Sequence, residues 1–406
     1  MAAILSTWTI DTLAGNGVPG YSGDGGSAVL ACLNEPKGVS LDRHGNVYVA
    51  DSENHVVRKI DRTTGMISTI AGRSVQDDQQ IIGRSDGTTV RAEEDPLADH
   101  NPATNGLSAY TQHTDLSGTV RYWTNRTSSI TRYAGDAGLA VHARLNFPTA
   151  VAVDQEGNLY IADTMNHRVR MVEAATGVIS TLAGTGQAGF SGDGEAAHEA
   201  TLNEPAALIL DESHQLYIAD QSNHRIRVVD LNTGLIQTIA GTGAAMYDGD
   251  GKPAANAALA GPSGLALADD RLYIADTFNG RIRCLHLSSG QISTVAGDGA
   301  SYRYESPSDP PSPSLARPTG IAVGHNGDLF LTDSDNHLIR QWDWDSGTAF
   351  CMAGNGGSSY SGDRGAAREA GLCYPFGIAV DRDGSLLVAD TFNHRIRLLA
   401  LELGTS

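Results

Sequence analysis

Residues 149–184 read TAVAVDQEGNLYIADTMNHRVRMVEAATGVISTLAG, and this stretch decides the fold. Apolar residues alternate with polar ones, and Gly157, Asn166 and Gly177 mark turns, a pattern typical of an antiparallel meander. A single four-stranded sheet leaves both of its faces uncovered, so further sheets must pack against it. The predicted strands are residues 149–154, 158–163, 168–172 and 178–184.

The stretch belongs to a repeat that runs along the whole chain. The dipeptide Ala-Gly, which ends the fourth predicted strand, recurs with a period of about 56 residues. Repeated radially, each sheet covers the next, which predicts an all-β fold: a β-propeller of four-stranded antiparallel blades. The alanines of the dipeptide are Ala14, Ala71, Ala134, Ala183, Ala240, Ala296 and Ala353.

Seven dipeptides predict seven blades in a single domain covering residues 1–406. The second blade, about residues 73–135, is irregular, with strands expected at 88–93 and 107–111 and in the stretch 119–135. A six-bladed ring, with residues 74–118 as an excursion, is the alternative.

The two ends of the chain are complementary. Residues 8–15 form a predicted fourth strand without the first three, whereas residues 376–400 supply three strands without a fourth. We therefore expect the N-terminal strand to close the last blade, which leaves no isolated sheet edge.

A second motif, Asp-x-x-Asn-His, which Arg follows directly in several repeats, lies at the turn between the second and third strands. This motif, often after Tyr-Ile-Ala, resembles the NHL repeat family, and the resemblance covers essentially the whole chain. It implies a propeller, but the family includes lyases, sensors and RNA or protein binders, so it does not imply one function. The motif occurs at Asn54-His55, Asn166-His167, Asn223-His224, Asn336-His337 and Asn393-His394, with the variant Asn279-Gly280.

We interpret this repeated motif as structural. Asp and Asn close turns onto their own backbone, and radial repetition separates the histidines too far for one shared metal. The arginine four residues after each Asn is equally regular and is expected to link neighbouring hairpins.

Composition excludes several classes of partner. The net charge is −19 with a pI near 4.9, which argues against nucleic acid and anionic membranes as partners. The four cysteines form no CxxC pattern, and no signal peptide or membrane-spanning run is visible. A cytoplasmic location is the resulting expectation.

Functional residues are expected where the repeats differ. The long connectors between blades lie on the same face as the Asn-His hairpins, so a site is expected at the channel mouth on that connector face. The residues that flank the proline at the start of each first strand vary most in chemistry. The predicted ligand-binding residues are Glu35, Lys37, Glu204, Arg317, Tyr374 and Phe376.

Some of these positions also suggest a metal. Carboxylate and amide oxygens suit Ca²⁺, and the placement is similar to gluconolactonase-like propellers, where such groups hold a central calcium ion. No cofactor is otherwise indicated. The candidate calcium ligands are Glu35, Asn146, Asn203 and Glu204.

The irregular second blade offers a separate candidate site. Tyr110, His113 and Asp115 lie near the expected hairpin of this blade, where a His near a carboxylate suits acid–base catalysis. A decayed repeat with solvated polar residues is the alternative.

Two functions follow as expectations. The first is a stand-alone propeller that binds a small molecule or a protein at the channel mouth. The alternative is an enzyme, a lyase, hydrolase or cyclase with or without calcium, whose active site lies at the same mouth.

Overall fold

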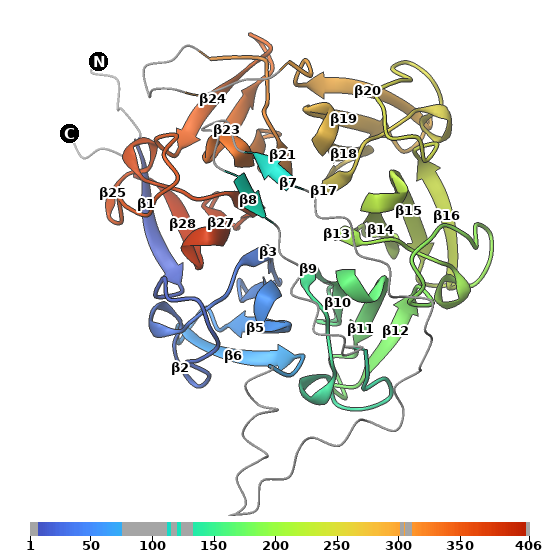
Figure 1. Ribbon diagram of the computed structural model, residues 1–406, viewed down its shortest axis with the longest axis horizontal. Coiled ribbons are helices and arrows are strands. Elements are labelled where there is room, and N and C mark those ends of the chain that lie inside the picture. The colour runs from blue at the N-terminus through green and yellow to red at the C-terminus, as the bar shows by residue number, and fades with distance from the viewer. Residues whose placement is uncertain are drawn as a thin grey trace, which may run out of the picture.

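Six sheets surround a central axis in the computed structural model (Figure 1), which describes residues 7–74, 133–300, 304 and 311–402 together with two short strands between 74 and 133. Each sheet is antiparallel and contains four long strands, as the repeat predicts. We number the sheets as blades 1–6 in chain order of their first strands. The first, or inner, strands of neighbouring blades contact one another around the axis.

The strands, from the inner to the outer edge of each blade, have the following bounds. Blade 1 contains β3 (Pro36–Leu41), β4 (Val47–Asp51), β5 (Val56–Ile60) and β6 (Met66–Ala71); blade 2 contains β9 (Pro148–Val153), β10 (Leu159–Asp163), β11 (Arg168–Val172) and β12 (Ile179–Ala183); blade 3 contains β13 (Pro205–Leu210), β14 (Gln215–Asp220), β15 (Arg225–Asp230) and β16 (Leu235–Ala240). Blade 4 contains β17 (Pro262–Ala268), β18 (Arg271–Asp276), β19 (Arg281–His286) and β20 (Gln291–Ala296); blade 5 contains β21 (Pro318–Val323), β22 (Leu329–Asp333), β23 (Leu338–Asp343) and β24 (Thr348–Ala353); blade 6 contains β26 (Pro375–Val380), β27 (Leu386–Asp390), β28 (Arg395–Glu402) and β1 (Thr7–Ala14).

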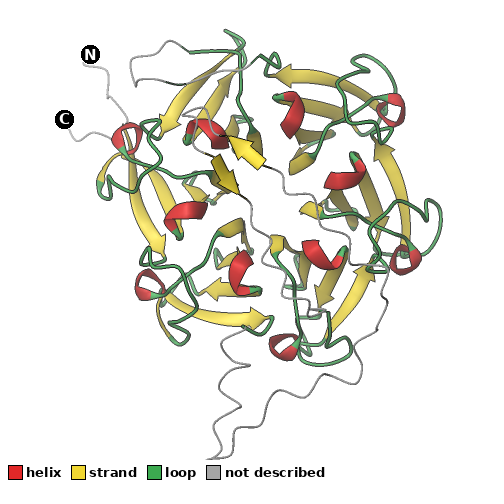
Figure 2. Ribbon diagram, viewed as in Figure 1, coloured by secondary structure: helices red, strands yellow, loops and turns green. Residues whose placement is uncertain are grey.

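Short 3-10 turns form two rings in Figure 2, one near the axis and one at the periphery. The inner ring consists of the hairpin turns η2 (Ser52–Asn54), η5 (Thr164–Asn166), η7 (Gln221–Asn223), η9 (Thr277–Asn279), η10 (Ser334–Asn336) and η12 (Thr391–Asn393). The outer ring lies in the connectors and consists of η1 (Ala28–Leu30), η4 (Ala140–His142), η6 (Ala197–Glu199), η8 (Ala254–Asn256) and η11 (Ala367–Glu369). Two short strands, β2 (Gly26–Ser27) and β25 (Gly365–Ala366), pair with the outer edges of blades 1 and 6.

The expectation of seven blades is wrong, because the ring has six. Ala134 does not end a strand and forms only a single bridge to Arg144. The hydroxyl of Tyr133 donates to Asp136 over 2.6 Å, as Tyr21 does to Asp24 over 3.1 Å, so the run Tyr133–Asp136 is a connector. The chain between Gly72 and Tyr133 is therefore an insertion in one connector, and it is about one repeat long.

The strands expected for the irregular blade are not part of any blade. The stretches 88–93 and 107–111 lie outside the described residues. Two short strands within the insertion, β7 (Gln112–Thr114) and β8 (Val120–Tyr122), pair with each other in a separate two-stranded sheet.

Closure by the N-terminal strand is confirmed. Strand β1 pairs antiparallel with β28, with Trp8 opposite Leu401 and Ile10 opposite Leu399. The side chain of Ile10 is buried in a core that also contains Leu386. The two ends of the described chain thus share one blade.

A buried Arg–Asp pair stabilises every hairpin. The six arginines that follow the Asn-His motif are buried, and each contacts the Asp that ends the second strand of its own blade at 3.0–3.5 Å. Five of them also pair with an Asp of the connector that leads into the same blade. The expectation that they link neighbouring hairpins is therefore wrong. The arginines are Arg58, Arg170, Arg227, Arg283, Arg340 and Arg397.

The same Asp gathers several donors. In blade 1, the Asp51 carboxylate accepts the backbone N–H of Asn34 at 2.7 Å and the side-chain amide of Asn54 at 2.8 Å. Burial raises the pKa of Asp51 to about 6, against the opposing effect of these hydrogen bonds and of Arg58. At neutral pH the carboxylate is therefore charged and pairs with the guanidinium.

The hairpin histidines join one blade to the next. Each imidazole Nδ1 accepts the backbone N–H of the residue that precedes the proline of the following inner strand, at 2.9–3.2 Å. Since Nδ1 is an acceptor, the ring is neutral and carries its proton on Nε2. The pairs, acceptor first, are His55–Phe147, His167–Glu204, His224–Gly261, His337–Tyr374 and His394–Glu35.

The inner strands approach one another closely. A Cβ atom at Gly38, Gly264, Gly320 or Gly377 would collide with a carbonyl oxygen of the neighbouring inner strand. Glycine is required at these positions because a backbone occupies the space of a side chain. The ring is narrow there, which shapes the cavity described below.

Deletion of residues 1–15 tests the closure. The deletion removes β1, exposes the edge of β28 and abolishes the burial of Ile10, which alone is worth about 2–5 kcal/mol. We expect a lower thermal midpoint and aggregation, measured by calorimetry and light scattering. A control that lacks only residues 1–6 should melt like the full chain; a fifteen-residue deletion that also does so would contradict the closure.

Shortening the insertion tests the blade count. A three-residue linker in place of residues 75–132 restores the spacing found between Gly15 and Tyr21. The entropic cost of closing a loop falls by about 0.6 kcal/mol each time the loop length is halved. The thermal midpoint of the shortened protein should therefore equal or exceed that of the full chain. Loss of cooperative unfolding would mean that the excised segment is part of the ring.

The histidine link predicts a pH-dependent stability difference. Burial lowers the pKa of His167, so the unfolded chain binds more protons at this site below about pH 6.5 and the stabilising link is lost as the pH falls. The variant His167→Asn, whose side chain tolerates the left-handed backbone found there (φ +52°), should cost about 1–2 kcal/mol at pH 7.5.

Urea unfolding at several pH values measures the difference in stability between wild type and His167→Asn. The other titrating groups are present in both proteins, so their effects cancel in this difference. The gap between wild type and His167→Asn should narrow from pH 7.5 to pH 5.5. The exposed His198 offers a matched control, for which His198→Asn should show no such trend. A pH-independent gap for His167 would show that its link does not depend on a neutral ring.

Candidate functional site

All six inner strands line one cavity of about 590 Å³ at the channel mouth. The hairpin turns η5, η7 and η9 also contribute to it, so the cavity opens on the face that carries the hairpins. Its lining is layered: the residue after each proline forms an outer ring, followed by Gly or Ala, and then by aliphatic side chains. The aliphatic ring consists of Val39, Val151, Leu208, Leu265, Ile321 and Ile378.

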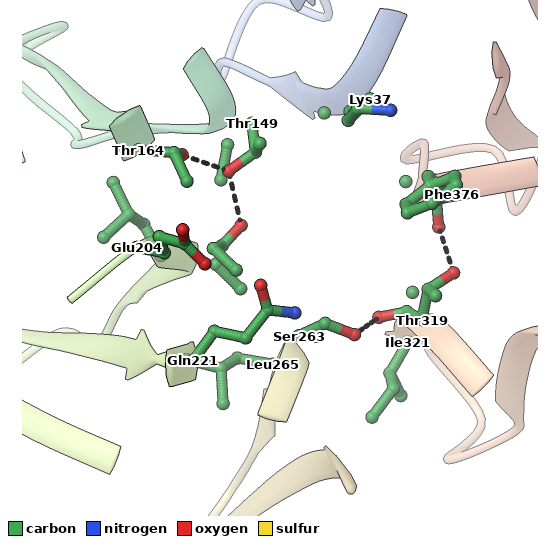
Figure 3. Close-up of a pocket in the computed structure, with 18 of the residues that line it drawn as sticks. Lys37, Thr149, Thr164, Glu204, Gln221, Ser263, Leu265, Thr319, Ile321 and Phe376 are labelled. Carbon is green, nitrogen blue, oxygen red and sulfur yellow. Dashed lines mark hydrogen bonds between the residues drawn. The ribbon is translucent and has the colours of Figure 1, made fainter. Parts of the chain in front are cut away.

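Three hydroxyl groups of the outer ring are used by the fold. Thr149 Oγ1 lies 2.6 Å from Thr164 Oγ1, and Ser263 Oγ lies 2.5 Å from Thr277 Oγ1. Thr319 Oγ1 is bonded to hydroxyl groups of its own blade in the same way. These hydrogen bonds, some of which are drawn in Figure 3, hold the outer-ring hydroxyl groups in place. Other side chains are therefore the ones that face the cavity with free polar groups.

The Lys37 side chain is buried, with 6% of its surface exposed, and its ammonium sits among aromatic rings. Nζ lies 4.5 Å from the ring centre of Phe376, 5.2 Å from that of Phe147 and 5.8 Å from that of Phe392. The Glu35 carboxylate is 3.6 Å away. Burial lowers the pKa of Lys37, although Glu35 opposes this effect.

Arg317 presents a second cation to the cavity. Its guanidinium lies 5.4 Å from the ring centre of Phe278, and its buried Nε has no hydrogen-bond partner among the described residues. No carboxylate of the described chain lies within ion-pair distance of it. Burial lowers the pKa of Arg317, and the charge of Asp335 opposes this effect. The guanidinium therefore retains its donors for a ligand.

The seam between blades 4 and 5 differs from the others at this point. Gly280 stands where five other hairpins have a His, so the link to the next blade is missing there. The backbone N–H of Arg317 is oriented toward Asp333 instead, at 3.4 Å. Arg317 consequently lacks the left-handed φ found at the equivalent residues of the other five blades: Glu35, Phe147, Glu204, Gly261 and Tyr374.

Glu204 supplies a carboxylate on another side. Its Oε2 accepts the hydroxyl of Ser222 at 2.6 Å, and in the described part of the chain Lys and Arg side chains form no ion pair with it. Gln221 extends next to it into the cavity in Figure 3, and the structure assigns its amide no hydrogen bond within the described residues.

The predicted ligand-binding residues divide into two groups. Lys37, Glu204, Arg317 and Phe376 line the cavity, whereas Glu35 and Tyr374 support it from behind. Glu35 pairs with Lys37. The buried Tyr374 ring packs edge-on against His337 and Phe392, at centroid distances of 4.6 and 5.3 Å.

The structure shows other contacts for the four candidate calcium ligands. Glu35 pairs with Lys37 and Glu204 with Ser222, while Asn146 and Asn203 donate backbone N–H groups to hairpin carboxylates. Within the described ranges, no three His, Cys, Asp or Glu side chains cluster in a way that could hold a metal. The calcium site stays a prediction.

The candidate catalytic group in the insertion is also untested. Tyr110 and Asp115 lie outside the described residues. His113 belongs to β7, of which only the backbone is described.

Sequence reasoning did not single out several residues of the cavity, among them Phe147, Gln221 and Phe278. A signal existed for Gln221, because the residue that follows the hairpin Asp is Ser or Thr in the other five blades. In blades 1, 2, 5 and 6 this hydroxyl bonds to the carbonyl of the proline that begins the next inner strand. Gln221 departs from this pattern and points into the cavity.

Family comparisons agree with the fold. The NHL repeat model matches residues 145–170, 315–342 and 372–397, and the teneurin NHL domain model matches residues 16–86. Among the described residues, no helix is long and apolar enough to cross a membrane.

The curated relatives are much longer than this chain. It is 31% identical over 277 residues to Protein SUPPRESSOR OF QUENCHING 1, chloroplastic, of Arabidopsis thaliana, an alignment that covers 64% of this chain and 26% of that protein. It is 29% identical over 288 residues to NHL repeat-containing protein 2 of Bos taurus, an alignment that covers 50% of this chain and 39% of that protein. The chain thus spans well under half of each relative.

A solved structure from Bacteroides thetaiotaomicron, a structural genomics protein of unknown function, shares the fold with a TM-score of 0.62. The alignment covers 98% of this chain and 76% of that chain at 17% identity, which establishes the architecture alone. Taken together, the family-model matches and the similarity to NHL repeat-containing protein 2 show that this chain belongs to the NHL-repeat β-propeller family.

Proposed function

We propose that this propeller binds a small organic molecule in the channel-mouth cavity. The observation that carries the proposal is the cavity itself: it has a volume of about 590 Å³, it is lined by both apolar and polar groups, and Arg317, Glu204 and Gln221 offer unused polar atoms there. Volumes of roughly 300–1,000 Å³ with a few convergent polar groups are typical of small-molecule sites. A concave site of this size favours a small ligand over a broad protein surface.

Blocking the cavity tests the proposal. In Ala206→Trp an indole would fill space that Ala206 lines, whereas Ala174→Trp places the same group on an exposed turn of the opposite face. We expect small organic probes, screened by thermal shift and titrated by calorimetry, to bind wild type and Ala174→Trp. A probe at 100 times its Kd stabilises the protein by about 2.7 kcal/mol.

The same probes should bind Ala206→Trp at least tenfold more weakly. Ser263→Phe fills the cavity from another blade and provides a second test if the first variant is unstable. Equal binding to both blocked variants, or no binding to wild type, would place the function elsewhere.

An enzyme at the same mouth is the second candidate, and Lys37 favours it. A buried amine whose pKa is lowered, next to the carboxylate of Glu35, is a combination that acid–base and nucleophilic catalysis both use. Mass spectrometry of the bound ligand after incubation distinguishes the two. A ligand recovered unchanged supports binding alone, whereas a product that Lys37→Met no longer forms supports catalysis.

A further inference from the structure

The polar groups of the cavity that have unused bonding capacity come from blades 3 and 5. Arg317 precedes the inner strand of blade 5, Glu204 precedes that of blade 3, and Gln221 lies in η7 of blade 3. The outer ring of blade 4, between them, contributes only Ser263. A cation and an anion thus face one cavity without contacting each other.

Arg317 is built to receive an anion. Its side chain is half-buried, and its Nε is fully buried without a hydrogen-bond partner among the described residues, which is unfavourable because that donor has lost its water without replacement. Its planar fork matches the two oxygens of a carboxylate. Its neighbourhood supports this role, since Phe278 packs on it and the missing His link at Gly280 relieves its backbone of the usual contact between blades.

Glu204 is the complementary group. One oxygen of the Glu204 carboxylate accepts a hydrogen bond from Ser222, which orients the side chain. Among the described residues, no Lys or Arg side chain forms an ion pair with Glu204. An ammonium group is the ligand chemistry that pairs with such a carboxylate, and the adjacent Gln221 amide can accept or donate a further hydrogen bond. A ligand with only one of the two charges would leave the other uncompensated.

The remaining wall of the cavity is apolar and aromatic. Phe376 lies across the cavity from Glu204 in Figure 3, and Phe147 belongs to blade 2. These two rings and Glu35 already surround the Lys37 ammonium, so Lys37 does not compete with Arg317 for a ligand anion. An apolar group of the ligand would pack on this wall.

We infer that the cavity binds a small amphipathic zwitterion, with its carboxylate on Arg317, its ammonium on Glu204 and its apolar group toward Phe147 and Phe376. The inference rests on the proposed small-molecule function. A free apolar α-amino acid and an apolar dipeptide share this chemistry and differ in the separation of their charges.

Calorimetric titration of the full chain with two probe sets tests the inference. The sets are phenylalanine and alanyl-phenylalanine, each compared with its methyl ester and its N-acetyl derivative. We expect one zwitterion to bind at least tenfold more tightly than both of its blocked forms. The set in which this occurs identifies an amino acid or a dipeptide as the source.

Two variants assign the contacts. Arg317→Met should abolish the preference for acid over ester while leaving the preference for amine over N-acetyl, and Glu204→Gln should do the reverse. Arg62→Met, on the opposite face and 40% exposed, should change neither preference. Thermal midpoints near that of wild type show that each variant is folded.

The outcomes separate the two proposals. If esters or neutral probes bind in the cavity as tightly as the zwitterions, or if either variant keeps the preference it should lose, the zwitterion inference is overturned and small-molecule binding stands. If no probe of any kind binds wild type, both are overturned.

Discussion

Each hairpin contains a buried Arg side chain that needs an acceptor in place of water. The geometry of every blade depends on how this guanidinium is paired. The Asp beside it accepts hydrogen bonds from the Arg of the third strand, from the hairpin Asn and from the backbone just before the inner strand. One carboxylate therefore positions three parts of a blade at once. Removing one partner of a buried ion pair costs about 3–5 kcal/mol, since the other charge is then left unpaired. Six repeats of this unit explain why the hairpins keep one geometry while the rest of each repeat varies.

The contacts between blades leave the channel mouth free to diverge. Hairpin His and Ser or Thr side chains bond to the backbone at the start of the next inner strand, through an N–H group or a proline carbonyl. Backbone groups are present whatever side chain occupies the position. Residues on either side of the proline can therefore be Glu, Lys, Arg or Phe without loss of the ring, and their Cβ atoms still converge on the axis. In this propeller, the scaffold is built from what the repeats share and the cavity from what they do not share.

Departures from the repeat cluster in consecutive blades. Gln221 replaces a hydroxyl residue in blade 3, Gly261 makes room for Phe278 in blade 4, and Gly280 removes the His link to blade 5. Each departure gives up an interaction or a side chain that the other blades keep. Together they surround the part of the cavity that lies between Glu204 and Arg317, which is where the polar capacity of the mouth is concentrated. A loss of stabilising contacts at the position of unpaired charge is a pattern typical of binding sites.

The alternating strands, the 56-residue period and the closure by residues 7–14 could all be predicted from the sequence, because they depend on local patterns that every blade repeats. The same holds for the cavity positions of Lys37, Glu204, Arg317 and Phe376, which follow from their place beside the prolines. The blade count was wrong because Ala134-Gly135 imitates the dipeptide that ends a strand at Ala71-Gly72. A sequence signal against it existed, since the run from Tyr133 to Asp136 matches the connector run from Tyr21 to Asp24. Tertiary structure also decided that Glu35 and Tyr374 stand behind the cavity and that the Arg317 guanidinium faces it without an ion-pair partner among the described residues. Side-chain direction and hydrogen-bond pairing depend on neighbours from other blades, and no pattern within one repeat contains that information.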